Sequence, residues 1–277
     1  GGMTTPFWTT PPIGTAAIQI DIDPEALGRN YPLEVAILGD ARSTLAAMVA
    51  GCDADESADR QAWTDRSRQI VSEWRGKYAN LIEADSTPMR PERICKELTE
   101  HMPDDAIVVA DTGHSGMWMG GMFDLSQPTQ SYIRSAGHLG WAFSAGLGAK
   151  CACPDRPVLT FTGDSGFWYH IGELETAVRW RINAVTLVNN NGSGNQSKLG
   201  FDRAYGGQQT EQAGELWKLS AVNFANIAES MGALGIRVER PSELPGALQR
   251  AFEAEQPVVI DCVSDIEAMA PLAWVPA

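Results

Sequence analysis

The chain has 277 residues, 44% hydrophobic and 20% charged, which is ordinary for a soluble globular protein and allows one large domain or one domain plus a fragment. Its net charge of −14 argues against non-specific nucleic-acid binding, and no apolar run is long enough to span a bilayer. The sequence shows no secretory leader and its five cysteines form no C-x-x-C pair, so we predict a cytoplasmic protein with reduced thiols.

Strands and helices alternate from the start of the chain. Residues 17–22 ("AIQIDI") and 34–40 ("EVAILGD") predict strands, and residues 41–51 predict a helix. Charged, tryptophan-containing sequence then runs from 52 to 88, with helical spacing across 63–82. We interpret residues 52–88 as a helical connecting segment.

From residue 90 the alternation restarts and continues to the end of the chain. The pattern predicts helices over 91–102, 140–152, 167–180, near 220–232 and over 244–254. It predicts strands over 106–110, 157–162, 184–188, 236–239 and 257–263. Such alternation is typical of an α/β fold with a doubly wound, mostly parallel sheet and helices on both faces.

Residues 163–166 read G-D-S-G, four letters shared with the nucleophile loop of trypsin-like proteases. Those proteases are built from β-barrels and also need an upstream His and Asp. Here the loop leads into a helix whose apolar positions, Phe167, Ile171, Leu174 and Val178, share one face. The letters also fail the G-x-S-x-G spacing of an exposed nucleophile. We therefore interpret the protease match as coincidence.

Asp164 and Asn191 each stand at the end of a predicted strand. One helix and one strand separate them, which predicts a right-handed βαβ crossover with both strand ends at the carboxyl edge of the sheet. Their oxygens suit Mg²⁺, which keeps open positions for phosphate oxygens. Gly163, Ser165 and Gly166 leave room for phosphates beside the backbone, and the helix start offers N–H donors. The sequence therefore predicts a magnesium and phosphate site.

The letters "GDS", a helix bearing "ELETA" and an Asn pair ending at Asn191 resemble the thiamin-diphosphate motif of acetohydroxyacid synthase-like enzymes. Residues 18–45 resemble the second half of that family's central domain, and residues from about 89 resemble its pyrophosphate-binding domain. The resemblance implies a partial central domain over 1–51, a connecting segment over 52–88 and a thiamin-diphosphate domain over 89–277.

The resemblance also implies roles for individual residues. The Mg²⁺ ligands would be the side chains of Asp164 and Asn191 and the backbone carbonyl of Ser193. Cofactor contacts would come from Thr112, Gly113, His114 and Ser115, from Gly163, Asp164, Ser165 and Gly166, and from Asn191, Ser193, Gly194 and Asn195. In "SAGHLGWAF" the Gly137 carbonyl would accept from the aminopyrimidine amine, and Leu139 would wedge between the two cofactor rings. His114, His138 and Leu139 are the candidate catalytic residues.

Structural interpretations of the same residues stay open. Asp164 could be a helix N-cap and the Asn run a turn. Leu139 could belong to the core, and His114 and His138 could be loop histidines with satisfied hydrogen bonds. The nearby His170, Trp168 and Trp180 are expected to have structural or packing roles.

The family's activating glutamate, which hydrogen-bonds the pyrimidine N1′, has no counterpart here. It belongs to a separate pyrimidine-binding domain that precedes the central domain, and nothing before residue 17 can be that domain. We expect an enzyme split over two genes, with this product starting at Met3; an excised fragment is the alternative. The implied assembly is a heterotetramer whose second subunit carries the pyrimidine domain and its Glu.

The implied activity is cleavage or formation of a carbon–carbon bond in 2-keto acids or related carbonyl compounds. Asn195 and Gln196 replace the Gly-Met pair of acetohydroxyacid synthases proper, and Gly200 stands near their downstream Trp, which speaks against true acetolactate synthesis. Residues 192–209 could form a mobile polar lid. The alternatives are a 2-hydroxyacyl-CoA lyase or oxalyl-CoA decarboxylase, a 2-oxoacid oxidoreductase β subunit, and a non-catalytic partner. Aldehydes and acyl-CoA are thus further candidate substrates.

Overall fold

The computed structural model describes residues 14–52, 58–134 and 137–271, so the expected gene start at Met3 lies outside the described residues. The chain forms two compact units, unit 1 over residues 1–69 and unit 2 over residues 70–277. The boundary falls inside the segment that the sequence predicts to connect two domains.

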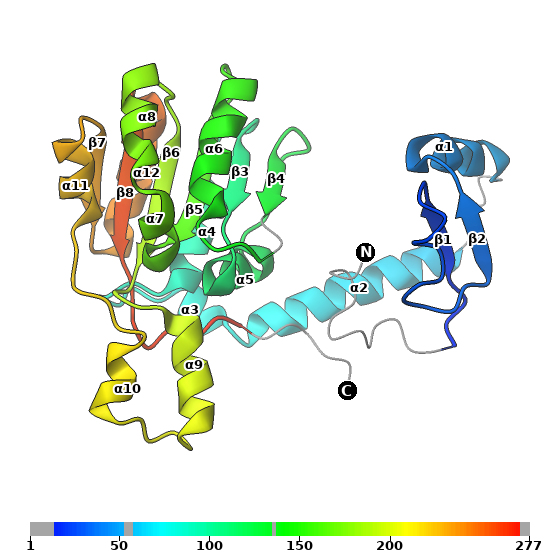
Figure 1. The fold of residues 1–277 in the computed structure, drawn as a ribbon, viewed down its shortest axis with the longest axis horizontal. Helices are drawn as coiled ribbons and strands as arrows, with labels where there is room; N and C mark the ends of the chain where they lie inside the picture. Colours follow the sequence, from blue (N-terminus) through cyan, green and yellow to red (C-terminus); the bar gives the residue numbers. More distant parts are fainter. Residues whose placement is uncertain (1–13, 53–57, 135–136, 272–277) are drawn as a thin grey trace. The chain divides into compact units, whose positions relative to one another are not determined.

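The described residues of unit 1 include two short strands, a helix and the start of a second helix (Figure 1). Strands β1 (Ile18–Asp21) and β2 (Val35–Leu38) pair in parallel, with Ile18 opposite Val35. Helix α1 (Ala41–Gly51) begins after Asp40, whose side chain accepts from the Ser43 N–H. Helix α2 (Ala58–Gly76) starts in unit 1 and ends in unit 2.

Unit 2 is built around a fully parallel sheet of six strands. Its order is β4 (Ser131–Arg134), β3 (Ile107–Ala110), β5 (Val158–Gly163), β6 (Val185–Asn190), β8 (Val258–Val263) and β7 (Leu234–Val238). The central strands are runs of apolar residues that are buried on both faces, as parallel strands between helical layers must be. The predicted fold class is confirmed.

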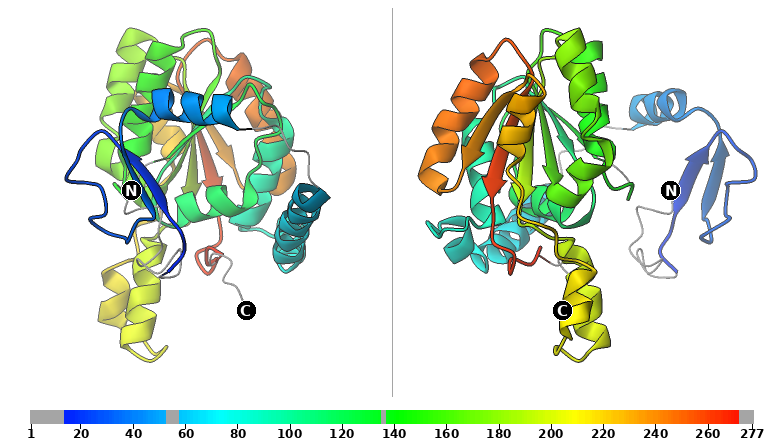
Figure 2. Two further views of the ribbon diagram at one scale, coloured as in Figure 1. Left: turned by 90° about the vertical axis from the view of Figure 1, so that its right-hand side faces the viewer. Right: turned by 60° about the vertical axis from the view of Figure 1, so that its left-hand side comes forward.

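Helices cover both faces of this sheet (Figure 1). One core packs the sheet against α4 (Pro91–His101), α5 (Gly113–Met122) and α12 (Leu244–Glu253). The other packs it against α6 (Trp141–Ala152), α7 (Asp164–His170), α8 (Glu173–Trp180) and α11 (Phe224–Ser230). The short elements are α3 (Ala79–Ile82) and η3 (Pro241–Glu243). Beyond the carboxyl edge of the sheet lie α9 (Asn195–Ala204) and α10 (Glu211–Glu215) (Figure 2).

The structure corrects several predicted elements. The single helix expected over 167–180 is two helices, α7 and α8, separated at residues 171–172. Strand β4, helix α5 and helix α9 were not predicted. α5 reads "GHSGMWMGGM", and its glycines have low helix propensity, so burial of Trp118 and Met119 decides its structure. Trp180 is 68% exposed, so its predicted packing role is wrong, whereas the Trp168 ring does pack on Phe224.

The five cysteines are all free thiols. Cys95 and Cys262 are fully buried, and burial raises the pKa of both thiols far above the ordinary value. Of the helices in the described residues, none is both long and apolar enough to cross a membrane.

Candidate functional site

Asp164 and Asn191 meet at the carboxyl edge of the sheet. β5 and β6 are neighbours, with Gly163 opposite Asn189; Asp164 is the first residue of α7, and Asn191 directly follows β6. The Ser193 N–H donates both to Asp164 Oδ2, at 3.0 Å, and to Asn191 Oδ1, at 3.2 Å. A carboxylate oxygen and an amide oxygen therefore converge on one backbone group.

Asp164 is 3% exposed, and its carboxyl group has a shifted pKa. Burial raises its pKa to about 6, while hydrogen bonds from the backbone of Ser165, Ser193 and Gly192 act in the opposite direction. Gly163, not Asp164, occupies the N-cap position of α7. The Asp164 carboxyl in the first turn of α7 thus lies buried among N–H donors that stabilise its ionised form, the form that can ligate a cation.

The loop that carries Asn191 is fixed by a second segment of chain. The Leu219 N–H donates to the Gly192 carbonyl at 2.7 Å, and the Gly194 N–H donates to the Trp217 carbonyl at 2.6 Å. Gly192 has φ +66°, a left-handed conformation that favours glycine. The segment after α10 therefore holds the position of Ser193 and its two acceptors.

The start of α5, with the loop that precedes it, lies against the end of β5 and against the start of α9. A Cβ added to Gly163 would lie 3.1 Å from Ser115 Oγ, and one added to Gly113 would lie 3.1 Å from Gln196 Oε1. Thr112 precedes α5 as its N-cap residue, so the loop presents the start of a helix. His114 is 8% exposed, its Nδ1 has no partner in the described part of the chain, and burial lowers the pKa of its ring.

The segment 137–140 approaches the same edge from the β4 side. Gly137 and His138 are exposed, whereas Leu139 is half-buried and so is not a core residue. Gly140, with φ +87°, has no room for a side chain, because a Cβ would lie 2.8 Å from the Gly166 carbonyl oxygen. This close approach packs the predicted aminopyrimidine segment against the start of α7.

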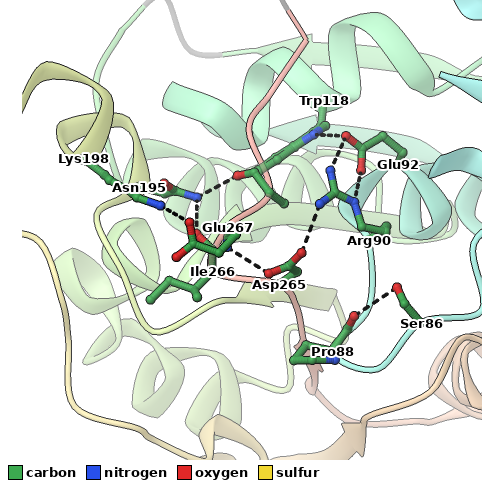
Figure 3. A network of polar contacts seen from close by, with 11 residues as sticks. Ser86, Pro88, Arg90, Glu92, Trp118, Asn195, Lys198, Asp265, Ile266 and Glu267 are labelled. Carbon is green, nitrogen blue, oxygen red and sulfur yellow. Dashed lines mark hydrogen bonds and ion pairs between the residues drawn. The ribbon is translucent and has the colours of Figure 1, made fainter. Parts of the chain in front are cut away.

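Asn195 anchors α9 to the segment after β8. Its Nδ2 donates to the carbonyls of Ile266, at 2.9 Å, and Ala268, at 2.7 Å, as Figure 3 shows for Ile266. Lys198, one turn further along α9, pairs with Glu267 (Figure 3). The predicted lid over 192–209 is thus partly a helix with fixed contacts.

The network continues from that segment into the helical layer. Asp265 accepts from the Arg90 guanidinium at 3.0 Å, and Arg90 also pairs with Glu92, whose side chain is fully buried (Figure 3). Glu92 in turn accepts from the Trp118 indole N–H at 3.2 Å. The segment after β8 is therefore tied to α4 and α5 as well as to α9.

Two residues at this edge, Asp111 and Asn189, are not among the site residues predicted from the sequence. Asp111 follows β3 as Asp164 follows β5, a parallel position that could have identified it. It is fully buried and receives hydrogen bonds from two loops and from strand β5. Asn189, near the end of β6, is 3% exposed, and its Oδ1 has no partner among the described residues.

Three of the buried side-chain atoms without a partner in the described residues belong to residues at or beside the predicted cofactor contacts. His114 Nδ1, Asn189 Oδ1 and Asn195 Oδ1 are buried without partners in the described residues, although buried polar atoms are nearly always hydrogen-bonded. Asn189 lies near the end of β6, and His114 and Asn195 lie in the first turns of α5 and α9, the helices that follow β3 and β6. The donor set, oxygen-rich beside Asp164 and served by two helix starts, fits a magnesium–diphosphate group.

Comparisons with known proteins show what this chain is similar to. Residues 111–262 match the family "Thiamine pyrophosphate enzyme, C-terminal TPP binding domain". The acetolactate synthase large subunit of Haemophilus influenzae is 30% identical over 87% of this chain and 42% of its own length. The acetolactate synthase large subunit of Corynebacterium glutamicum is 30% identical over 89% of this chain and 40% of its own length. The sulfoacetaldehyde acetyltransferase of Castellaniella defragrans is 29% identical over 92% of this chain and 46% of its own length. The chain thus spans less than half the length of these curated relatives.

Proposed function

The chain belongs to the thiamine pyrophosphate enzymes that share a C-terminal TPP-binding domain, and we propose that it binds thiamin diphosphate and Mg²⁺ in an enzyme that cleaves or forms carbon–carbon bonds beside a carbonyl group. The observation that carries this proposal is the convergence of Asp164 Oδ2 and Asn191 Oδ1 on the Ser193 N–H. A few protein oxygen ligands of this kind would be enough to hold Mg²⁺, which usually takes its remaining ligands from phosphate groups and water.

Each predicted loop has a part in this proposal. Asp164, Asn191 and the Ser193 carbonyl hold the metal, while residues 112–115 and 163–166, with Gly194 and Asn195, surround the diphosphate. Residues 137–139 would hold the aminopyrimidine end, where Leu139 would separate the two rings, and His114 and His138 are the candidate catalytic residues. When bound, the cofactor supplies a nucleophilic carbon and an electron sink, and the chain's residues bind it, orient it and exclude water.

For the substrate we propose a 2-keto acid or a related carbonyl compound. The similar proteins include two acetolactate synthase large subunits and a sulfoacetaldehyde acetyltransferase. The polar residue Gln196 stands at the start of α9, where its Oε1 lies beside Gly113 of a proposed cofactor loop. Nothing in the described residues favours the acyl-CoA or the 2-oxoacid oxidoreductase alternative over this one.

We further propose a second polypeptide that carries a pyrimidine-binding domain with the activating Glu, in a cytoplasmic heterotetramer with two copies of each chain. Two of the similar proteins are named large subunits, which is consistent with a multi-subunit enzyme. The chain alone should bind the cofactor weakly and have no turnover.

Removal of Asp164 tests the metal site. We expect Asp164→Ala to lower the Mg²⁺-dependent affinity for thiamin diphosphate roughly 100-fold or more, because it removes a charged ligand of the ion. Titration calorimetry with thiamin diphosphate, with and without Mg²⁺, measures the effect. The matched control is Asp155→Asn, an exposed aspartate just before β5 rather than just after it. Unchanged affinity in Asp164→Ala would refute the metal assignment.

Reconstitution tests the proposed activity. Turnover of 2-keto acids, aldehydes and acyl-CoA compounds is assayed with this chain alone, with a polypeptide carrying the pyrimidine domain, and with both together. We expect turnover only from the mixture. Substantial turnover by this chain alone would contradict the need for a partner, and the substrate that is consumed decides between the candidate reactions.

A further inference from the structure

Asp111 joins three segments of the site through one carboxylate. Its Oδ1 accepts from the Thr112 N–H at 2.9 Å, and its Oδ2 accepts from the Thr162 hydroxyl at 2.8 Å. The Gly140 N–H lies 3.1 Å from Oδ1 and 3.0 Å from Oδ2. Asp111 is fully buried. Its donors thus belong to the β3–α5 loop, to the end of β5 and to the residue that precedes α6.

The residues around the Asp111 carboxylate are tightly packed. A Cβ added to Gly166 would lie 2.3 Å from Asp111 Oδ2, and one added to Gly116 would lie 2.4 Å from the Asp111 carbonyl oxygen. Glycine is therefore required at both positions for the loops to close around Asp111. Gly166 is also one of the residues predicted to line the diphosphate, so the carboxylate lies directly behind the proposed cofactor loop.

We propose that Asp111 is a positioning residue that sets the distance between the segment holding the aminopyrimidine, residues 137–140, and the loops holding the diphosphate, residues 112–115 and 163–166. This inference rests on the proposed function. The two ends of the cofactor are covalently linked, so both can be held at once only when these segments are correctly spaced. Asp111 touches neither end and acts through the backbone of Thr112 and Gly140.

The chemistry of the carboxylate explains why this position is sensitive. Its negative charge faces the N-terminal ends of α5 and α6, where helix dipoles favour an anion. It has enough lone pairs to accept from all three donors. In Asp111→Asn the negative charge is lost without a change in side-chain size. One oxygen must then serve both backbone N–H groups, and the contact with the Thr162 hydroxyl can persist only with the new NH₂ group as donor.

The test compares the whole cofactor with its tail. The ligands are thiamin diphosphate with Mg²⁺ and inorganic pyrophosphate with Mg²⁺, titrated calorimetrically into the full chain. The variants are Asp111→Asn and Thr162→Val, and the matched control is Thr160→Val, a buried threonine on the same face of β5 whose hydroxyl has no partner in the described residues. Thermal unfolding checks that each variant is folded.

We expect Asp111→Asn to weaken thiamin diphosphate binding about 10- to 100-fold and Thr162→Val about 3- to 10-fold, while both keep their pyrophosphate affinity within about 3-fold. Thr160→Val should leave both affinities unchanged. If Asp111→Asn does not fold, Thr162→Val decides the question.

Two results would overturn the inference while leaving the proposed function intact. Unchanged thiamin diphosphate affinity in the folded variants would show that Asp111 does not position the segments. An equal loss of affinity for both ligands would show that it only shapes the diphosphate loops. If the wild-type chain binds neither ligand, the proposed function fails, and the inference fails with it.

Discussion

Units 1 and 2 are both built from parallel strands and helices, but they differ in how completely their apolar side chains are buried. Residues 14–52 of unit 1 include no buried residue at all. Its apolar side chains stay in contact with solvent: Ile18 is 56% exposed, Leu38 is 61% exposed and Val49 in α1 is 75% exposed. The two strands pair with each other in unit 1, yet the strands and the helix form no closed core in the described part of the chain.

In unit 2 the same kind of pattern gives two closed cores. Leu187 and Val259 are fully buried between a six-stranded sheet and helices on both of its faces. The difference lies in the number of layers, because a parallel sheet is stable only when both faces are covered. An alternating sequence pattern therefore predicts strands and helices in both units, but it does not predict which unit is closed.

Hydrogen exchange should show the largest contrast between the two units. Amides of β5 and β6 can exchange only when unit 2 unfolds, so we expect their protection factors to exceed about 10⁴. Amides of β1 and β2 should open locally, with protection below roughly 100-fold. Exchange of the full chain measured by mass spectrometry gives both values together. Equal protection in the two units would show that unit 1 has a closed core of its own.

How much of the fold the sequence predicts follows from this contrast. The buried strands of unit 2 were predicted because their apolar runs are bounded by turn residues. β4 and α5 were missed, since a four-residue edge strand and a glycine-rich helix carry almost no local signal and take their structure from packing. Long-range contact, not local propensity, decides these elements.

The features of the site also divide into those that the sequence predicts and those that depend on long-range contacts. The meeting of Asp164 and Asn191 was predictable, because a βαβ crossover places neighbouring strand ends together. The role of Asp111 in joining the loops was not, because its partners Gly140 and Thr162 lie 29 and 51 residues away along the chain. Trp180 looked like a packing residue from its size alone, but it stands at the end of α8 with its ring exposed.

Equal truncations in the two units should differ by several kilocalories per mole. Leu187→Ala removes a fully buried side chain from β6, and we expect it to lower the free energy of unfolding by about 2–5 kcal/mol. Leu38→Ala removes a 61% exposed side chain from β2 and should cost less than about 0.5 kcal/mol. Urea titrations followed by circular dichroism measure both changes. A large loss in Leu38→Ala would contradict the open state of unit 1.

The smallest difference between the two units should come from paired threonine variants, and here the change in unit 2 should have the opposite sign. Thr160 Oγ1 is buried and has no partner in the described residues, and it lies against the backbone of α6 at Gly146. Thr160→Val replaces this unsatisfied hydroxyl with a methyl group, so we expect stabilisation of up to about 1 kcal/mol. Thr44→Val in α1, where the side chain is only half-buried, should change the stability by less than about 0.5 kcal/mol in either direction. Thermal unfolding of both variants measures the difference. A loss of stability in Thr160→Val would contradict the expectation, and would show either that the hydroxyl has a favourable partner or that a methyl group does not fit against Gly146.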